Sequence, residues 1–449
     1  MSAAFEVRIE WLEAPGVSTP ELAATWARYE IWSNNRCVTQ VEAADGTFRR
    51  SVYGSLYPLA EWVASNWWVL TSNIRPSAVD TRYWTWPNVR THPWLRQHNL
   101  RGAGDGMAWP DLTVVTEGAV TRIVWVPDAD RPLGPVRFAS SGDALDRAEE
   151  VVEGLASIVY HVLERLAEER LPKTRLAEEW DAVSRADDEE REFYRTVARL
   201  GLDPYSITDQ MAAEVVDIAS KLPPELSDDF FDSADPTALA GAAEWTRKAM
   251  VAADRASAKA SAPLDPLYEA VSYSTEEPAD VAKSARNGEK PWTFGYAMAS
   301  RLRHELNVEN TDQFDTSPWV GVSDVSAPSN GIQGIATVRN SRCGLVLGGL
   351  RAVRSTRFGQ ARALGRVLAR PQQHSFVLSA ARGYDERVAG AFAAELLAPA
   401  EGIRQSLDAI GKHDDAALEA VARHFRVSPL LVRHQYDNQI ARTSYRIFL

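Results

Sequence analysis

The amino-acid sequence predicts an α+β fold with several domains, and three observations support this. A chain of 449 residues is too long for one hydrophobic core. Hydrophobic residues make up 45% and charged residues 24% of the chain, fractions typical of globular proteins rather than of disordered or membrane proteins. Alternating apolar residues indicate strands before residue 140, and from Gly142 onward the apolar spacing becomes that of helices.

Residues 1–140 form the first predicted domain, a mixed α/β domain rich in tryptophan. Eleven of the fifteen tryptophans precede residue 126. Apolar spacing over residues 56–70 predicts a helix. The dipeptide Glu117-Gly118 separates two alternating stretches and predicts a hairpin. The predicted strands are Phe5–Trp11, Leu112–Thr116 and Ala119–Val126.

Residues 141–260 are predicted to form a helical, acidic middle domain. Helical periodicity covers Ala144–Ala167, Arg175–Leu200 and Ile207–Leu222. We interpret its acidic residues as solvated helix faces and caps, and the alternative is an acidic surface that faces a basic partner. Residues 261–289 have few large apolar side chains, which indicates a linker that proteases cut first. The acidic residues include Glu178, Glu179, Asp187, Asp188, Glu189, Glu190, Asp228, Asp229, Asp232 and Asp235.

The charge, the hydropathy and the cysteines exclude several classes of protein. A net charge of −12 argues against a protein that coats nucleic acid with its whole surface. No apolar run approaches the roughly 18 residues that span a bilayer. Residues Met1–Arg8 lack the basic and apolar regions of a signal peptide. We therefore expect a cytoplasmic location and no membrane partner. Cys37 and Cys343 have no neighbouring Cys or spaced His, which argues against a disulfide framework and a zinc ribbon.

The segment 339–382 is rich in arginine, and the stretch between Asp324 and Asp385 contains no acidic residue. Arginines without acidic neighbours are a typical footprint of nucleic-acid binding. The same arginines could instead dock onto the acidic middle domain, and the sequence leaves both interpretations open. The arginines are Arg339, Arg342, Arg351, Arg354, Arg357, Arg362, Arg366, Arg370 and Arg382.

Four segments in the last 160 residues carry a family resemblance. They are Lys290-Pro-Trp-Thr-Phe-Gly, Gly331-Ile-Gln-Gly-Ile, Arg357-Phe-Gly-Gln-Ala-Arg-Ala-Leu-Gly-Arg-Val-Leu and Glu386-Arg-Val-Ala-Gly-Ala-Phe-Ala-Ala-Glu-Leu-Leu-Ala-Pro. Together they resemble the ImmA/IrrE family of zinc metallopeptidases, most specifically in the run from Phe392 to Pro399. The resemblance implies a zincin-like lobe over residues 290–449.

The resemblance also implies where a zinc site would lie. The family pattern R-F-x-x-A-H-E-x-G-H places two zinc-binding histidines one helical turn apart, beside a glutamate that activates water. At the matching positions Arg362 and Arg366 replace the histidines and Ala363 replaces the glutamate, while Glu386 matches the third, carboxylate ligand. A guanidinium stays protonated and cannot bind zinc. The resemblance therefore implies a pseudo-metallopeptidase, not an enzyme, with no catalytic residues, no metal and no cofactor.

These replacements lead to a specific structural expectation. A buried carboxylate without a cation would pay a desolvation cost of several kcal/mol, and a guanidinium can offset that cost. Arg362 and Arg366 lie one turn apart, so both should face the degenerate metal site. We therefore expect at least one of them to contact Glu386 and form a structural clamp. The alternative is that both arginines turn outward to solvent.

The tail over residues 416–432 resembles half of a helix-turn-helix, with Ser428 as the N-cap of its second helix. Related peptidases commonly end in such an element, packed on the catalytic lobe, and we expect the same packing here. The alternative is contact with DNA. The candidate contacts for anions or nucleic acid are Arg351, Arg354, Arg357, Arg423, Arg426 and Arg433.

The leading functional hypothesis is a non-catalytic regulator that binds a protein partner on an inactive peptidase scaffold. The resemblance points to bacterial stress response, mobile-element control, phage defence or a toxin-antitoxin setting. One alternative is an enzyme with its active site in the N-terminal domain, where a Gly-rich segment begins at Arg101. The other is nucleic-acid binding through the segment 339–382. The polar candidates for the N-terminal active site are Tyr53, His98, Arg101 and Asp105.

Overall fold

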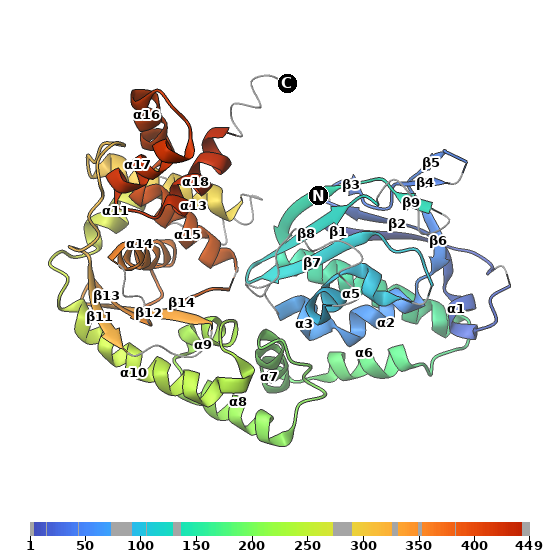
Figure 1. Ribbon diagram of the computed structural model, residues 1–449. Coiled ribbons are helices and arrows are strands. Elements are labelled where there is room, and N and C mark those ends of the chain that lie inside the picture. The colour runs from blue at the N-terminus through green and yellow to red at the C-terminus, as the bar shows by residue number, and fades with distance from the viewer. Residues whose placement is uncertain are drawn as a thin grey trace. The chain divides into compact units, whose positions relative to one another are not determined.

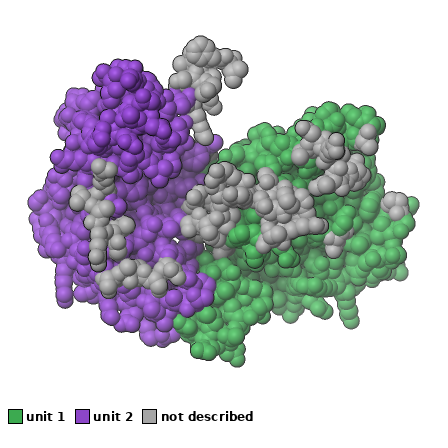
Figure 2. All heavy atoms as spheres, viewed as in Figure 1, with its two compact units in different colours: residues 1–215 green, residues 216–449 purple. Residues whose placement is uncertain are grey.

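The chain has a multi-domain α+β fold that divides into two compact units, residues 1–215 and residues 216–449 (Figures 1 and 2). None of the helices in the described residues has both the length and the apolar character needed to cross a bilayer. The computed structural model describes residues 4–14, 16–43, 45–72, 92–104, 106–128, 136–272, 290–325, 331–348, 353–381 and 383–441.

Unit 1 contains small antiparallel sheets covered by helices. In the first sheet β2 pairs with β1, β3 and β6, the second has the order β10-β8-β7, and the third has the order β5-β4-β9. Its strands are β1 (Phe5–Trp11), β2 (Trp26–Ser33), β3 (Arg36–Cys37), β4 (Val41–Ala43), β5 (Phe48–Arg49), β6 (Val52–Ser55), β7 (Asp111–Glu117), β8 (Val120–Val126), β9 (Val136–Phe138) and β10 (Gly142–Arg147). Its helices are α1 (Pro20–Ala24), α2 (Tyr57–Ser65), α3 (Trp67–Ser72), α4 (Pro93–His98), the short 3-10 helix η3 (Leu100–Ala103), α5 (Ala148–Glu168), α6 (Arg175–Arg185) and α7 (Asp188–Arg199), and α8 (Asp209–Lys221) crosses into unit 2.

The tryptophan-rich sequence forms one core with helices that follow it in the chain. Trp62, Trp68, Trp109 and Trp125 are buried in a cluster that also includes apolar residues of α5 and α6. The predicted hairpin is confirmed, because β7 and β8 pair antiparallel across the turn at Gly118, whose φ is +71°. The strand predicted at the N-terminus is confirmed as β1.

Two of the predicted helices are interrupted. Asn66 ends α2, where its side-chain amide donates to the carbonyl oxygen of Trp62 at 2.8 Å, so α2 and α3 replace the single helix predicted there. Asp187 and Glu190 form a capping box that starts α7 after α6 has ended. The predicted helix from residue 144 begins only at Ala148, because the preceding residues pair with β8 as β10.

Unit 2 is built on a mixed sheet with the order β11-β13-β12-β14, in which β11 and β13 are parallel and the other neighbours are antiparallel. Its strands are β11 (Val320–Val325), β12 (Ile332–Arg339), β13 (Arg342–Gly348) and β14 (Ser375–Ser379). Its helices are α9 (Pro224–Phe231), the 3-10 helix η4 (Pro236–Ala238), α10 (Leu239–Ser257), α11 (Asp265–Ser272), α13 (Pro291–Glu305), α14 (Val353–Ala369), α15 (Tyr384–Leu397), α16 (Ala400–Ile410), α17 (Asp415–Phe425), α18 (Pro429–Gln435) and the π-helical turn η5 (Tyr436–Ala441).

Helices α10 and α14 cover opposite faces of this sheet (Figure 1). On one face a Cβ at Gly344 would lie 1.8 Å from the carbonyl oxygen of Ala253, so only glycine lets α10 approach this closely. On the other face Leu347 of the same strand packs against Gly359 of α14. Helix α15 then packs against both α13 and α14.

The two compact units divide the chain at a different place from the predicted domain boundaries. Helices predicted within a middle domain over 141–260 are shared between the units, because α5 and α6 join the core of unit 1 while α10 joins the sheet of unit 2. The predicted linker, 261–289, differs as well. Its residues 265–272 form α11, where Leu267 is buried, and residues 273–289 lie outside the described residues.

Candidate functional site

Helix α14 carries the two arginines and the alanine at the positions of the degenerate metal site. Arg362 and Arg366 are one turn apart, and their side chains are 13% and 2% exposed. Ala363 is fully buried in the helix packing. Glu386 lies in the first turn of α15 with 10% of its side chain exposed. The four positions therefore meet at the contact between α14 and α15, close to the end of β14.

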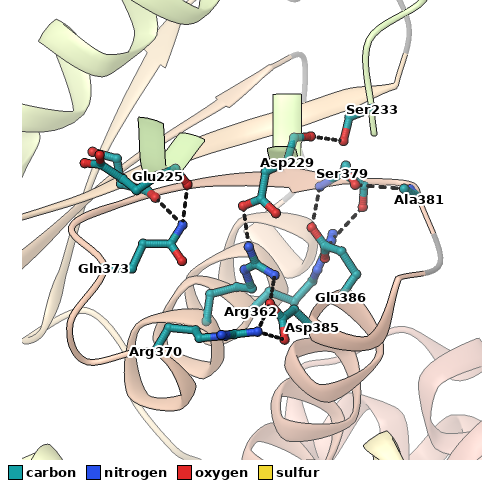
Figure 3. Close-up of polar contacts among 12 residues, drawn as sticks. Glu225, Asp229, Ser233, Arg362, Arg370, Gln373, Ser379, Ala381, Asp385 and Glu386 are labelled. Carbon is teal, nitrogen blue, oxygen red and sulfur yellow. Dashed lines mark hydrogen bonds and ion pairs between the residues drawn. The ribbon is translucent and has the colours of Figure 1, made fainter. Parts of the chain in front are cut away.

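The predicted contact with Glu386 is confirmed for Arg362. One Nη of Arg362 donates to the Glu386 carboxylate and, at 2.7 Å, to the carbonyl oxygen of Ser379. The other Nη donates to the side-chain oxygen of Gln333. The second carboxylate oxygen of Glu386 accepts from the Ser379 amide at 2.8 Å (Figure 3). Each charge in this buried pair thus has further polar partners, which is the condition for such a pair to be tolerated.

Arg366 has different partners from those expected. Its guanidinium pairs with Asp229 of α9 and, at 3.2 Å, with Asp385 of α15. Burial lowers the pKa of Arg366, but the surrounding carboxylates outweigh burial and raise it above its usual value. Arg370, one turn further along α14, also reaches Asp385 at 3.2 Å. The expectation that at least one of the two arginines contacts Glu386 is met by Arg362, whereas Arg366 pairs with the neighbouring Asp229 and Asp385.

Asp229 and Asp385 were missed as members of this cluster. Asp385 directly precedes Glu386, so its position in the first turn of α15 was readable from the sequence. The sequence predicts that Asp229 lies on a solvated acidic helix face, yet α9 brings it onto Arg366, 137 residues away in the chain. Only the packing of α9 against β14 reveals this contact.

The cluster is a network of ion pairs between arginines and carboxylates. Its three arginines face three carboxylates, so opposite charges are matched one to one. In the part of the chain that the structure describes, no group of three or more His, Cys, Asp or Glu side chains is arranged to hold a metal ion. The arrangement can clamp α14, α15 and α9 together.

The tail packs against the rest of unit 2, as expected for a structural element. The side chain of Arg357 donates to the carbonyl oxygens of Phe425 at 3.0 Å and Arg426 at 3.1 Å, at the end of α17. Ser428 caps α18, as the sequence predicts. Arg426 is exposed, with a φ of +54° that ends α17 in the left-handed conformation.

The other candidates for anion or nucleic-acid contact have varied surroundings. Arg433 pairs with Asp415, and Arg423 is exposed. Arg351 and the side chain of Arg354 lie outside the described residues.

Arg339, near the start of the arginine-rich segment, pairs with Asp254 of α10 at 3.1 Å. Arg366 likewise pairs with Asp229. Both aspartates belong to the acidic stretch before residue 260, so these arginines do dock onto acidic residues of the same chain.

Three of the four polar candidates of unit 1 lie within the described residues, each with its own surroundings. Tyr53 is exposed on β6. His98 is fully buried, stacks on Trp94 with 4.2 Å between ring centroids, and has its Nδ1 2.9 Å from the carbonyl oxygen of Val114. Arg101 instead pairs with Asp128. Asp105 lies outside the described residues.

Arg101 belongs to a buried polar network of its own. Its Nε donates to the carbonyl oxygen of Trp109 at 3.1 Å. Asn99 donates to Asp111 at 2.7 Å and to Thr113 at 2.9 Å, which ties η3 to β7. These contacts hold the start of the Gly-rich segment, residues 101–104, against β7 and its neighbours.

None of the protein-family models compared with the chain matches it, and no curated protein matches it either.

Proposed function

We propose that the chain is a non-catalytic binding protein, a regulator built on an inactive peptidase-like scaffold. The observation that supports this proposal is the pairing of Arg362 with Glu386. In the resembled family the corresponding positions hold a histidine and a carboxylate that share a zinc ion. Here the guanidinium supplies the positive charge, and a protonated guanidinium has no lone pair for a metal.

The surroundings of the pair support the same proposal. Gln333 and Ser379 accept further hydrogen bonds from Arg362, and Arg366 is held by two aspartates. A polarised water and a general base are the requirements of a hydrolytic zinc site. Ala363, which stands at the position of the base, has no ionisable group and is buried.

We further propose that the partner is a protein and that the setting is a bacterial regulatory one, in stress response, mobile-element control or phage defence. The nucleic-acid alternative has less support, because Arg339, Arg357, Arg362, Arg366 and Arg370 all have partners within the chain. The alternative of an active site in unit 1 has less support as well, because its described candidates have separate contacts.

Elemental analysis and partner capture test this proposal. The purified protein is expected to carry well under one zinc per chain and to cleave no protein in a metal-dependent manner. Products of neighbouring genes, presented to the immobilised full chain, are expected to include one that is retained. One tightly bound zinc per chain would contradict the inactive site, and retention of nucleic acid alone, lost at raised salt, would favour the nucleic-acid alternative.

A further inference from the structure

Helix α9 lies against β14, a strand at the end of the order in the sheet of unit 2. Three contacts fix the helix there. At its start Gln373 donates to the carbonyl oxygen of Glu225 at 2.8 Å (Figure 3). In its middle Asp229 pairs with Arg366. Beyond its end the chain approaches Gly331 so closely that a Cβ there would lie 1.8 Å from the carbonyl oxygen of Ser233.

The sequence of α9, Pro-Glu-Leu-Ser-Asp-Asp-Phe-Phe, has two distinct faces. Leu226, Phe230 and Phe231 are buried, whereas Glu225 and Asp228 are exposed. Asp229 stands between these faces and is the residue that meets the arginine. The helix therefore attaches by an apolar face and one acidic contact, which is the usual way an amphipathic helix binds a groove.

The length of α9 favours a helical form that depends on packing against the rest of the unit. It has 8 residues, and isolated helices shorter than about 12 residues are marginal in water. Its first turn begins at Pro223-Pro224, which separates it from α8. Helix α8 in turn crosses the boundary between the two compact units. A helix of this kind, next to a connection between units, is held in place mainly by what it docks onto.

The docking surface has the opposite charge character from α9. Arg366 and Arg370 of α14 belong to it, and their counterions are Asp385 and Asp229. If Asp229 left, Arg366 and Arg370 would share the single carboxylate of Asp385 while Arg362 kept Glu386. The vacated surface would then carry an excess positive charge next to β14, the strand that α9 contacts.

We propose that this surface is a docking site for an acidic amphipathic helix, that α9 occupies it within the chain, and that a partner segment of the same chemistry takes the place of α9. The proposal rests on the proposed function as a binding protein. An intramolecular segment acts at an effective concentration of about millimolar. A partner therefore competes only when α9 is loosened or when its own segment binds more tightly.

The test uses the full chain and a fluorescein-labelled synthetic peptide with the sequence of residues 222–235. Asp229→Arg places a positive charge against Arg366 and is expected to release α9. Hydrogen exchange of residues 224–231 should then rise, and the peptide should bind at least about tenfold more tightly than to the unaltered chain, a change of about 1.4 kcal/mol. Glu225→Arg is the matched control, because it makes the same charge change on an exposed position of the same helix.

The milder variant Asp229→Asn covers the case in which the charge reversal prevents folding, as judged by circular dichroism. It is expected to raise both exchange and peptide affinity by about threefold, since it removes the charge but keeps the shape. If neither folded Asp229 variant differs from Glu225→Arg in exchange or in peptide binding, the proposal is wrong. A peptide that itself carries Asp229→Arg should not bind, and binding by that peptide would also overturn it. These measurements need no partner, so their failure would leave the zinc and partner tests of the proposed function untouched.

Discussion

Arg362 and Glu386 form an ion pair that joins the middle of α14 to the first turn of α15, with the backbone of Ser379 bound to both side chains. Because the pair is nearly buried, removing one member strands the charge of the other in a poorly solvated place. Removing both leaves no charge behind. The two kinds of change therefore have very different expected effects.

Glu386→Ala should lower the free energy of unfolding by roughly 3 to 5 kcal/mol, the usual result of breaking a buried pair on one side. The double change Arg362→Met with Glu386→Leu should cost far less than this single change. Urea denaturation of each variant measures the difference. Glu401→Ala, on an exposed ion pair with Arg404, serves as the control. A Glu386→Ala protein that unfolds like the unaltered chain would show that the site is open to solvent.

Replacing Arg366 in addition to Arg362 and Glu386 tests a second set of ion pairs. A triple change that also replaced Arg366 by Leu would remove the arginine that pairs with Asp229 and would leave Asp385 with Arg370 alone. The triple variant is therefore expected to be less stable than the double variant. Equal stability of the two would mean that the ion pairs of Arg366 contribute little.

Restoring histidines tests whether α14 and α15 keep the geometry of a zinc site. In a chain with Arg362→His, Arg366→His and Asp229→Asn, two imidazoles one turn apart would stand near Glu386. We expect about one zinc per chain by elemental analysis, and no hydrolysis, because position 363 has no base. The control replaces Arg370 instead of Arg366. A zinc content equal to that of the control would mean that α14 and α15 do not keep the geometry of the family's zinc site.

The elements that the sequence could predict are those whose signals are local. The turn at Gly118 and the cap at Ser428 depend on residues adjacent to them, and both are present. The contact of Arg362 with Glu386 could be inferred because the family resemblance places both positions at one site. This inference needs no knowledge of the rest of the fold.

The parts that could not be predicted depend on long-range packing. The acidic run around Asp229 has the composition of a solvated helix face, and nothing near it in the sequence reveals that Arg366 will be its partner. The positions of the domain boundaries also depend on long-range packing. Helices α5 and α10 have similar periodicity, but α5 completes the core of unit 1 and α10 covers the sheet of unit 2.

His98 gives unit 1 a predicted dependence on pH. Burial lowers the pKa of its imidazole from about 6.5 to about 4, so the folded state keeps the ring neutral. Between these values the unfolded chain binds a proton that the folded chain does not. Stability is therefore expected to fall as the pH decreases from about 6.5 to about 4, by up to roughly 3 kcal/mol from this residue.

Urea denaturation at a series of pH values measures this effect. In His98→Gln the free energy of unfolding should fall less over that pH interval, because one fewer proton is taken up on unfolding. His434→Gln, on an exposed residue, should leave the pH dependence unchanged. If His98→Gln shows the same pH dependence as the unaltered chain, the buried ring is not the group that titrates.

Glu395 of α15 connects the C-terminal tail to the rest of unit 2. Its buried carboxylate accepts from Gln435 at 2.8 Å and from Gln439 at 2.9 Å, and it also faces the amide of Ala400. Burial raises the pKa of Glu395, and these donors act against that rise. One side chain thus joins α15 to the start of α16 and to both sides of the junction between α18 and η5.

Glu395→Ala removes one acceptor from each of these donors, although Gln435 keeps the carbonyl oxygen of Ala398 and Gln439 keeps the side-chain oxygen of Gln435. Each N–H group left unpaired out of reach of water costs roughly 1 to 3 kcal/mol. We expect the α18 and η5 segment to detach before the rest of unit 2 unfolds, with faster hydrogen exchange over residues 429–441 than over β12 and β13. Glu395→Gln keeps an acceptor oxygen and should have a smaller effect, and Asp437→Ala, on the exposed side of η5, should have almost none. Uniformly raised exchange across unit 2 would instead mean that Glu395 supports the whole lobe and that the tail has no separate attachment.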